Sequence, residues 1–260
     1  MRPSGQGRCL FGLSLHSSAL HGRWLRLYAS QKDGLHFQQL AHALVGFDGP
    51  TLLLLQDEAG AAFGAFCSGG WKVAKDGFRG GGAGNFLFRA MPSFAVYRSK
   101  GNTDGNFMYL NVDGFSLPHG LGFGLASSNN KKNNKNHGSS SSSSGITGPE
   151  SFRLFLPEGR FEECVSRSAC STYESGALAY LPSSSSGGAG TFRLVAVEAW
   201  AVGGEAVVSA ALEARGVVRA VAEAQRRKNG TVDKRQFLGD FDKEHLLGKT
   251  FGGGGDAGRR

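Results

Sequence analysis

Residues 51–67 read TLLLLQDEAGAAFGAFC, and they contain the clearest indication of the fold class. The run Thr51–Gln56 is apolar on both faces, which is typical of a strand in the middle of a packed sheet. Asp57–Gly60 has the composition of a turn, and Ala61–Cys67 returns as the second arm of a hairpin. Gly64 in that arm indicates that a neighbouring backbone or ring comes close. We therefore predict a β-hairpin at the centre of a sheet.

Further strand signals lie on both sides of this hairpin. Trp24–Ser30 precedes it as a strand-like run, and the apolar residues between Leu35 and Leu44 recur at helical spacing up to a stop at Gly46. Several short strand-like runs also follow the hairpin, and runs that recur in this way are typical of an antiparallel all-β core. We therefore predict a mainly β domain with flanking helices, of the α+β class. The later runs, aromatic or β-branched and bounded by Gly, Asn, Asp or Pro, are 85–88, 94–97, 107–111, 152–156 and 191–202.

Composition divides the 260 residues into a domain and less regular parts. With 41 glycines the chain is too glycine-rich to be compact throughout. An Asn, Lys and Ser tract within 127–147 and a Ser/Gly run at 183–190 cannot bury enough apolar surface to fold, so we expect a disordered insertion and a loop. The predicted parts are a basic tail at 1–22, the domain at 23–204, and a helical extension at 205–260 that ends in a disordered Gly-rich tail.

The extension begins with an amphipathic helix, predicted over Ala206–Lys228. Its apolar residues, among them Val208 and Leu212, fall on one helical stripe. Charged residues, among them Arg215 and Arg219, lie on the opposite side. Because a β domain offers this helix no evident seat, we expect it to be an appendage.

The net charge of +8 is unevenly distributed. Residues 1–32 carry five Lys or Arg and no Asp or Glu, whereas residues 33–204 carry 13 of each class. A nucleic-acid surface concentrates cations on one face, so a neutral domain argues against nucleic-acid binding. The acid-free start has the composition of a mitochondrial transit peptide, and an arbitrary tail explains it equally well. No apolar run approaches the ~20 residues that span a bilayer, so no transmembrane segment is predicted.

The polar residues form no motif for catalysis, a metal or a cofactor. The four cysteines are sparse, and neither a CxxC pair nor an HExxH spacing is present, so no structural zinc is expected. Cys170 adjoins Ser171 and Thr172, yet no histidine is forced towards this run by the sequence. Cys67 lies in an apolar strand and is predicted to be a small buried hydrophobe. One alternative stays open, a peroxide-reactive thiol at Cys67, Cys164 or Cys170.

Two glycine-rich runs, Gly80–Gly84 and Gly120–Gly124, have the composition of phosphate-binding loops. Both lack the Gly-Lys-Ser/Thr ending of a P-loop, and neither opens a helix whose amides could receive a phosphate. We predict that Gly80–Gly84 is a loop without a binding function, and we expect no nucleotide cofactor at either run.

Glu198 is the most informative acidic residue. It lies between Val197 and Trp200 in the last β segment. If Val197 points inward, strand alternation directs Glu198 outward, beside an aromatic surface. A solvated strand position and a contact with a partner are both consistent with this placement.

Taken in order, these motifs make the chain resemble the TLDc family, whose members include the oxidation-resistance proteins and a nuclear-receptor coactivator. The resemblance covers residues 24–203. Within the family, the 108–111 and 117–122 runs and the helix after Gly203 are similar to the mTOR-associated, lysosomal branch. The matching runs are Trp24–Ser30, Gly34 with Phe37, Gly49–Leu54, Phe63–Phe66, Trp71, Asn85–Phe88, Tyr97, Cys170–Tyr173 and Val197–Trp200.

The resemblance implies a two-sheet antiparallel β-sandwich flanked by helices. It also implies a non-enzymatic protein, because no established active site comes with the domain. Family members bind the vacuolar proton pump (V-ATPase) and are linked to oxidative-stress resistance. In the mTOR-associated branch the C-terminal helix helps to hold the pump. The expected localisation is cytoplasmic with recruitment to the lysosomal or vacuolar surface, and the expected state is a monomer.

This chain departs from the family pattern in two places. The family's glycine-rich turn and Phe-Gly-Leu-Trp strand are replaced by the Asn/Lys/Ser insertion and Phe152–Leu156. The sequence also offers no glycine after Met1, so anchoring by myristate is not supported. We expect no catalytic, cofactor or metal residues, and we expect partner contacts at Glu198, Trp200, Val208, Leu212, Arg215 and Arg219.

Overall fold

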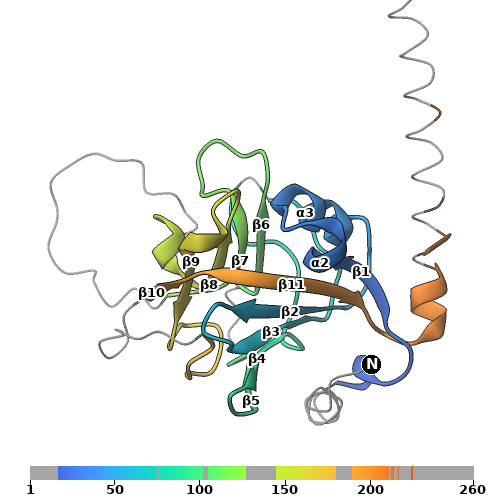
Figure 1. The fold of residues 1–260 in the computed structure, drawn as a ribbon, viewed down its shortest axis with the longest axis horizontal. Coiled ribbons are helices and arrows are strands. Elements are labelled where there is room, and N and C mark those ends of the chain that lie inside the picture. The colour runs from blue at the N-terminus through green and yellow to red at the C-terminus, as the bar shows by residue number, and fades with distance from the viewer. Residues whose placement is uncertain are drawn as a thin grey trace, which may run out of the picture. The chain divides into compact units, whose positions relative to one another are not determined.

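The computed structural model describes residues 17–74, 76–101, 105–126, 145–179, 189–210, 212–213, 216 and 224. The chain divides into two compact units, Met1–Ala211 and Leu212–Arg260. All the named helices and strands belong to the first unit. They form two antiparallel sheets with a few short helices, so the predicted fold class is confirmed (Figure 1).

The first sheet has six strands in the order β1-β11-β2-β3-β4-β5. The predicted hairpin at 51–67 is its centre, because β2 pairs with β3 on one side and with β11 on the other. This position explains why β2 is apolar on both faces. The bounds are β1 Leu25–Ala29, β2 Thr51–Asp57, β3 Ala62–Cys67, β4 Phe86–Met91, β5 Ala95–Arg98 and β11 Leu194–Ala201.

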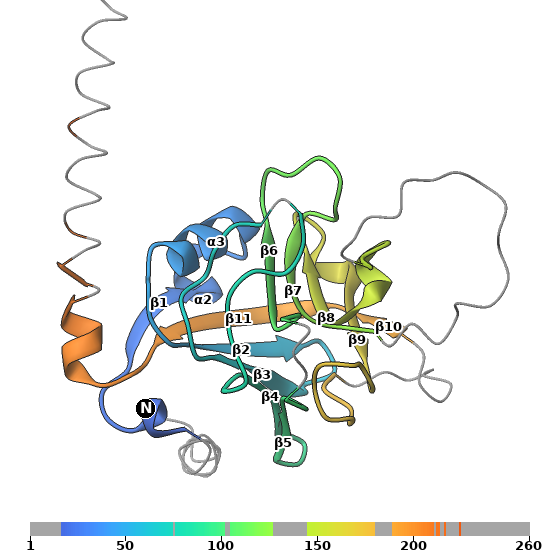
Figure 2. The same cartoon turned by 180° about the vertical axis from the view of Figure 1, so that it is seen from behind.

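The second sheet has five strands in the order β10-β9-β8-β7-β6. In Figures 1 and 2 its strands run across the direction of β11 and β2, so the strands of the two sheets cross. The bounds are β6 Met108–Asn111, β7 Gly120–Leu125, β8 Phe152–Pro157, β9 Cys164–Arg167 and β10 Ala189–Phe192.

Short helices flank the sheets. The predicted helix after the first strand is confirmed as α3, Phe37–Val45, with Leu40 and Leu44 fully buried and Gly46 at its C-terminus. Figures 1 and 2 show α2, Ser30–Asp33, and α3 beside β1. Three 3₁₀ turns complete the described elements, η1 Ser18–Leu20, η2 Pro149–Ser151 and η3 Phe161–Glu163.

The main core fills the space between the two sheets. Leu53 and Phe63 from the first sheet and Phe123 and Leu154 from the second all belong to it, and each is fully buried. Gly64 performs the predicted task on the opposite side of β3. A Cβ at this position would lie 2.8 Å from the ring of Phe88, so only glycine lets that ring cover the strand.

Three features of the sheets differ from the predictions. The run 191–202 is not one strand: it breaks at Arg193 into β10 and β11, which belong to different sheets. A register shift between Leu194 and Ala196 places both Leu194 and Val197 in the core, which strict alternation along the run would not allow. Neither β7 nor β9 was predicted, because the glycines of β7 obscure its apolar pattern and β9 has only four residues.

The edges of the predicted low-complexity parts contain packed residues. Leu20, within the predicted tail 1–22, is buried, and Gly203 N donates to Ala19 O at 2.7 Å. Ile146, within the predicted insertion 127–147, is also buried. The rest of that insertion, 127–144, and residues 183–188 of the predicted 183–190 loop lie outside the described residues. Residues 189 and 190 of that loop belong instead to β10.

Candidate protein-binding surface

The outer face of the six-stranded sheet, turned away from the main core, is apolar. At its centre Leu52, Phe66, Phe86 and Phe88 are buried. The rings of Phe66 and Phe86 stack with centroids 5.0 Å apart. Around this centre the apolar side chains are only half-buried, and they include Leu54, Ala90, Val96 and Trp200. An apolar sheet face that is only partly covered is unusual on the surface of a monomeric protein.

Trp200 is the centre of one part of this surface, which we call the Trp200 face: Trp24, Arg26, Leu54, Glu198 and Trp200. Strand pairing brings them together, because Trp200 lies opposite Arg26 of β1 and Glu198 lies opposite Leu54 of β2. The Trp24 and Trp200 rings have centroids 6.3 Å apart, and Arg26 Cζ lies 5.9 Å from the Trp200 centroid. The face therefore presents two indoles flanked by a cation and a carboxylate.

Glu198 has a defined role within this face. Val197 is fully buried, and Glu198 is directed to the outer side as predicted. Trp200 Nε1 donates a hydrogen bond to Glu198 Oε2 at 3.0 Å, which fixes the orientation of the indole. Because this bond uses one carboxylate oxygen and the side chain is half-exposed, Glu198 can still accept a bond from a partner.

The predicted contacts in the extension lie in different environments. Residues 205–210 are helical, and Val208 is 4% exposed because it packs with Phe47 and Ala201. Val208 therefore fixes the start of the helix to the sandwich. Leu212 is helical and 46% exposed. Arg215 and Arg219, and most of the predicted helix Ala206–Lys228, lie outside the described residues.

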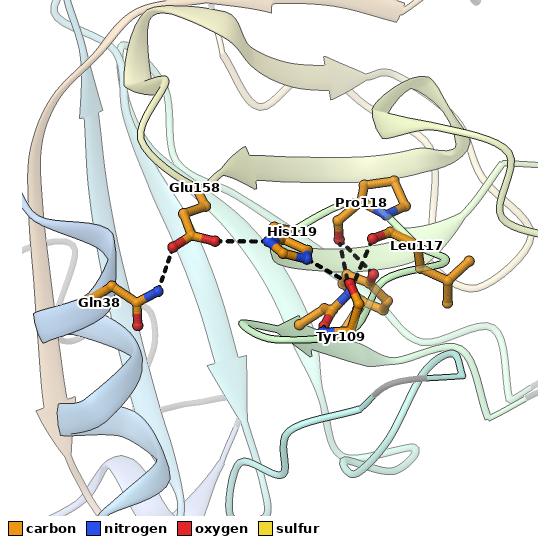
Figure 3. Close-up of polar contacts among 8 residues, drawn as sticks. Gln38, Tyr109, Leu117, Pro118, His119 and Glu158 are labelled. Atoms are coloured by element: carbon orange, nitrogen blue, oxygen red, sulfur yellow. Dashed lines mark hydrogen bonds and ion pairs between the residues drawn. The ribbon is translucent and has the colours of Figure 1, made fainter.

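A polar cluster lies at the β6–β7 loop (Figure 3). His119 Nδ1 lies 3.1 Å from Glu158 Oε2, and His119 Nε2 lies 2.5 Å from Gly114 O. Gln38 Nε2 donates to the other oxygen of Glu158, so the carboxylate joins α3 to the turn after β8. Asn111 also holds the loop, because its Oδ1 accepts a hydrogen bond from Gly114 N at 2.8 Å.

This cluster has the geometry of a structural clasp. Glu158 and Gly114 both present acceptors to His119, so only the protonated ring can donate to both. None of the described hydrogen bonds of His119 involves a Ser, Thr or Cys side chain. A nucleophile activated by histidine needs such a contact, and the cluster does not supply one. Sequence reasoning missed this pair because His119 and Glu158 are 39 positions apart.

The clasp holds a loop with an unusual tip. Phe115 is fully exposed, although Leu117 two positions later is buried. Tyr109 donates to Pro118 O at 2.6 Å, which ties the end of the loop to β6. Besides Trp200, Phe115 is another apolar side chain on the described surface that a partner could cover.

The thiols differ in their surroundings. Cys67, Cys164 and Cys170 are free and buried, which confirms the prediction for Cys67. Burial raises the pKa of the Cys67 thiol well above its usual range. Burial also raises the pKa of Cys164 to about 12. At neutral pH both are therefore protonated, and a protonated thiol is a poor nucleophile.

Among the described residues no group of three or more His, Cys, Asp or Glu side chains could hold a metal ion. The helices in the described part of the chain are all too short or too polar to cross a lipid bilayer.

Comparison with known proteins places this architecture in a family. A profile for the TLDc domain matches residues 10–203, which include both sheets. The mTOR-associated protein MEAK7 of Gallus gallus is 40% identical over 105 residues, which are 40% of this chain and 22% of that protein. MEAK7 of Mus musculus is 39% identical over 113 residues, 43% of this chain and 24% of the relative. Oxidation resistance protein 1 of Bos taurus is 35% identical over 101 residues, 39% of this chain and 11% of the relative.

These matches cover a small share of the relatives. The aligned part is less than a quarter of each MEAK7 protein and about a tenth of the oxidation resistance protein. The similarity therefore concerns a domain that the relatives carry together with much additional chain.

Proposed function

Since the chain belongs to the TLDc domain family, we propose that it is a non-enzymatic module that binds and regulates the vacuolar proton pump through the Trp200 face. The partner is chosen from the resemblance to the mTOR-associated, lysosomal branch of the family, and the matches to MEAK7 proteins support this choice. The expected roles are in oxidative-stress resistance and mTOR signalling at the lysosomal surface. The docking site is on the ATP-hydrolysing peripheral sector of the pump.

The only partly buried indole of Trp200 is the observation that carries this proposal. Tryptophan and arginine are the residue types that contribute most to protein interfaces, and here Arg26 lies over the Trp200 ring. The hydrogen bond from Trp200 to Glu198 holds the indole in one orientation before binding. A preorganised aromatic side chain loses little conformational entropy when a partner covers it.

The C-terminal extension supplies a second foothold in this proposal. Val208 fixes the beginning of the helix to the sandwich, and Leu212 and the predicted contacts Arg215 and Arg219 follow it. Two weak contacts on one molecule bind more tightly than either alone, because the second forms at a high effective concentration.

A pull-down of pump subunits with purified full-length chain tests the first foothold. Trp200→Ala should reduce retention of the peripheral-sector subunits at least tenfold. Val195→Ala is the matched control, because Val195 is an exposed residue of the same strand outside the Trp200 face. Equal retention by Trp200→Ala and the wild type would remove this face from the proposal.

Truncation tests the second foothold. The chain should be cut after Ala211, where the first unit ends, and not before Val208, whose removal would expose Phe47 and Ala201. Weaker retention by residues 1–211 supports the clamp. Unchanged retention restricts binding to the sandwich.

A thiol-based redox protein is the competing function. Of its three predicted thiols, Cys67 and Cys164 are protonated at neutral pH, so this alternative depends on Cys170. Turnover of hydrogen peroxide by the purified protein, compared with a variant lacking all four cysteines, distinguishes an enzyme from a binding module. Sustained, cysteine-dependent turnover would contradict the non-enzymatic assignment.

A further inference from the structure

One row of paired residues crosses all six strands on the outer face of the first sheet. Directly paired residues of neighbouring antiparallel strands project from the same face. The two arginines at the ends of the row are exposed, whereas Leu52, Phe66 and Phe86 in its middle are buried. Because all members of the row lie in the sheet, a segment outside the sheet must cover this middle part. The row consists of Arg26, Trp200, Leu52, Phe66, Phe86 and Arg98.

Leu20 supplies cover for the middle of the row. It is 2% exposed and packs in the same buried cluster as Leu52 and Phe66. The other described buried members of this cluster lie in the strands of the sheet or, as Val202 does, directly after β11. Leu20 belongs instead to residues 17–23, which precede β1 and which we call the strap. Figures 1 and 2 show the strap beside the chain that leaves β11.

The strap is joined to the rest of the domain by few polar interactions. Gly203 N donates to Ala19 O at 2.7 Å, and Trp24 Nε1 donates to Leu20 O at 3.1 Å. Within the described residues, no other hydrogen bond leads out of the strap. The remaining ones, such as the bond from Leu20 N to Ser17 O, lie inside it. The strap can therefore keep its own turn when it separates from the sheet.

Opening of the strap leaves the sheet intact. Pairing of β1 with β11 begins at Leu25, after the strap, so no strand pair is lost. An ion pair joins Arg23 to Glu205 at 3.8 Å, but the two side chains are 73% and 78% exposed, and such pairs contribute little to stability. The burial of Leu20 is therefore the main interaction that holds the strap. A segment with so few buried contacts can open locally without global unfolding.

The strap also determines the state of the Trp200 face. The carbonyl oxygen of Leu20 holds the Trp24 indole, whose ring centroid lies 6.3 Å from that of Trp200. When the strap opens, Trp24 loses this bond and the middle of the row becomes accessible. The apolar surface then extends from Trp200 through Leu52 to Phe66. This surface has room for one apolar side chain at the place that Leu20 has left.

We propose that the strap is an intramolecular cover of the docking face, that it opens separately from the domain, and that an apolar side chain of the partner then takes the place of Leu20. This inference rests on the proposed function, because it concerns regulation of the same face. While the strap is closed, the partner contacts the Trp200 face alone. The fraction of open chains therefore limits the apparent affinity.

Opening of the strap is tested by amide hydrogen exchange in the purified full chain, resolved by nuclear magnetic resonance. Gly203 N donates to the strap, whereas the neighbouring Val202 N donates to Pro50 O within the domain at 3.0 Å. After correction for intrinsic rates, Gly203 should exchange at least about tenfold faster than Val202. Equal corrected rates would show that strap and domain open together, which overturns the proposal.

A substitution in the strap tests what holds it closed. Leu20→Ala removes the buried side chain and should raise the exchange rate of Gly203 at least about tenfold, with Val202 unchanged. His21→Ala is the matched control, because His21 is an exposed residue of the strap. An equal rise at Gly203 and Val202 would place Leu20 in the cooperative core of the domain and would also overturn the proposal.

Regulation is tested by the retention of pump subunits on the same variants. Leu20→Ala should increase retention at least about threefold, because more chains are open, and His21→Ala should match the wild type. If the wild type binds and Leu20→Ala retains no more than it does, the cover is overturned and the proposed function stands.

If no chain retains pump subunits, the proposed function fails, and the cover is then decided by the fluorescence of the apolar dye 1-anilinonaphthalene-8-sulfonate. Stronger dye fluorescence with Leu20→Ala than with the wild type and His21→Ala supports the cover. Equal fluorescence of the three chains overturns it.

Discussion

The outer faces of the two sheets contrast in how they are covered. On the five-stranded sheet, Tyr109, Phe152 and Phe155 are fully buried, because loop residues such as Leu117 and Ile146 cover them. On the six-stranded sheet the cover is incomplete, and Trp200 remains half-exposed. Among the described residues, loops therefore complete one face and cover the other only in part. Mutations on the closed face should act on stability, and mutations on the open face should act on binding.

The largest effect is expected on the closed face. Phe155 stacks on Phe152 with ring centroids 4.7 Å apart, and both are fully buried. Phe155→Ala should lower the free energy of unfolding by about 3–5 kcal/mol, because it removes a buried ring and leaves a cavity. Urea denaturation followed by circular dichroism measures this. Phe94→Ala, at an exposed phenylalanine, should cost less than about 1 kcal/mol. Equal losses in the free energy of unfolding for the two variants would contradict the expected role of the closed face.

On the open face, the dominant effect should be on binding. Trp200→Ala should weaken pump binding by about 2 kcal/mol, roughly thirtyfold, as for a central aromatic interface residue. Its cost in the free energy of unfolding should be smaller than that of Phe155→Ala, because the indole is half-exposed. Titration by surface plasmon resonance and denaturation of the same samples measure the two quantities. A variant that is less stable but binds normally would make Trp200 structural.

Replacing Glu198 changes a single charge on the open face. Glu198→Gln keeps an oxygen that can accept from Trp200 Nε1, so stability should change by less than about 1 kcal/mol. Binding should weaken by about 1–2 kcal/mol if a partner cation pairs with the carboxylate, and added salt should reduce the difference from wild type. A binding difference that salt does not alter would exclude an ionic contact.

The smallest effect is expected at the clasp. His119→Ala removes the contacts with Glu158 and Gly114, and because the His119 and Glu158 side chains are 43% and 27% exposed the loss should be at most about 1 kcal/mol. Hydrogen exchange of the β6–β7 loop should accelerate while exchange in the main core stays unchanged. His42→Ala, at another exposed histidine, is the control. Unchanged exchange in the loop would show that Asn111 and Tyr109 suffice to hold it.

Much of the six-stranded sheet was predictable because its signals are local. A short run that is apolar on both faces is typical of a central strand, and β2 is one. The spacing of apolar residues in α3 and the turn between β2 and β3 are likewise local properties. The glycine-rich strand β7 and the short strand β9 were not predicted, because they are stabilised by pairing with β8, one on each side of it.

The candidate sites were predictable only in part. The outward direction of Glu198 follows from strand alternation, but its bond to Trp200 and the stacking of Trp24 depend on how β1 pairs with β11. The clasp at His119 and Glu158 joins separate turns. Arginine is usually found at the surface, and only the folded chain shows that Arg153 is buried.

The mainly β class, the central hairpin and the family resemblance can be inferred from the amino-acid sequence, because each depends on neighbouring residues or on the order of short motifs. The folded structure is needed to show which apolar face is only partly covered, where the break at Arg193 sends the chain into the other sheet, and which charges are buried. Those outcomes arise from contacts between residues far apart in the chain. Their energies depend on pairing, cover and desolvation, which no local pattern contains.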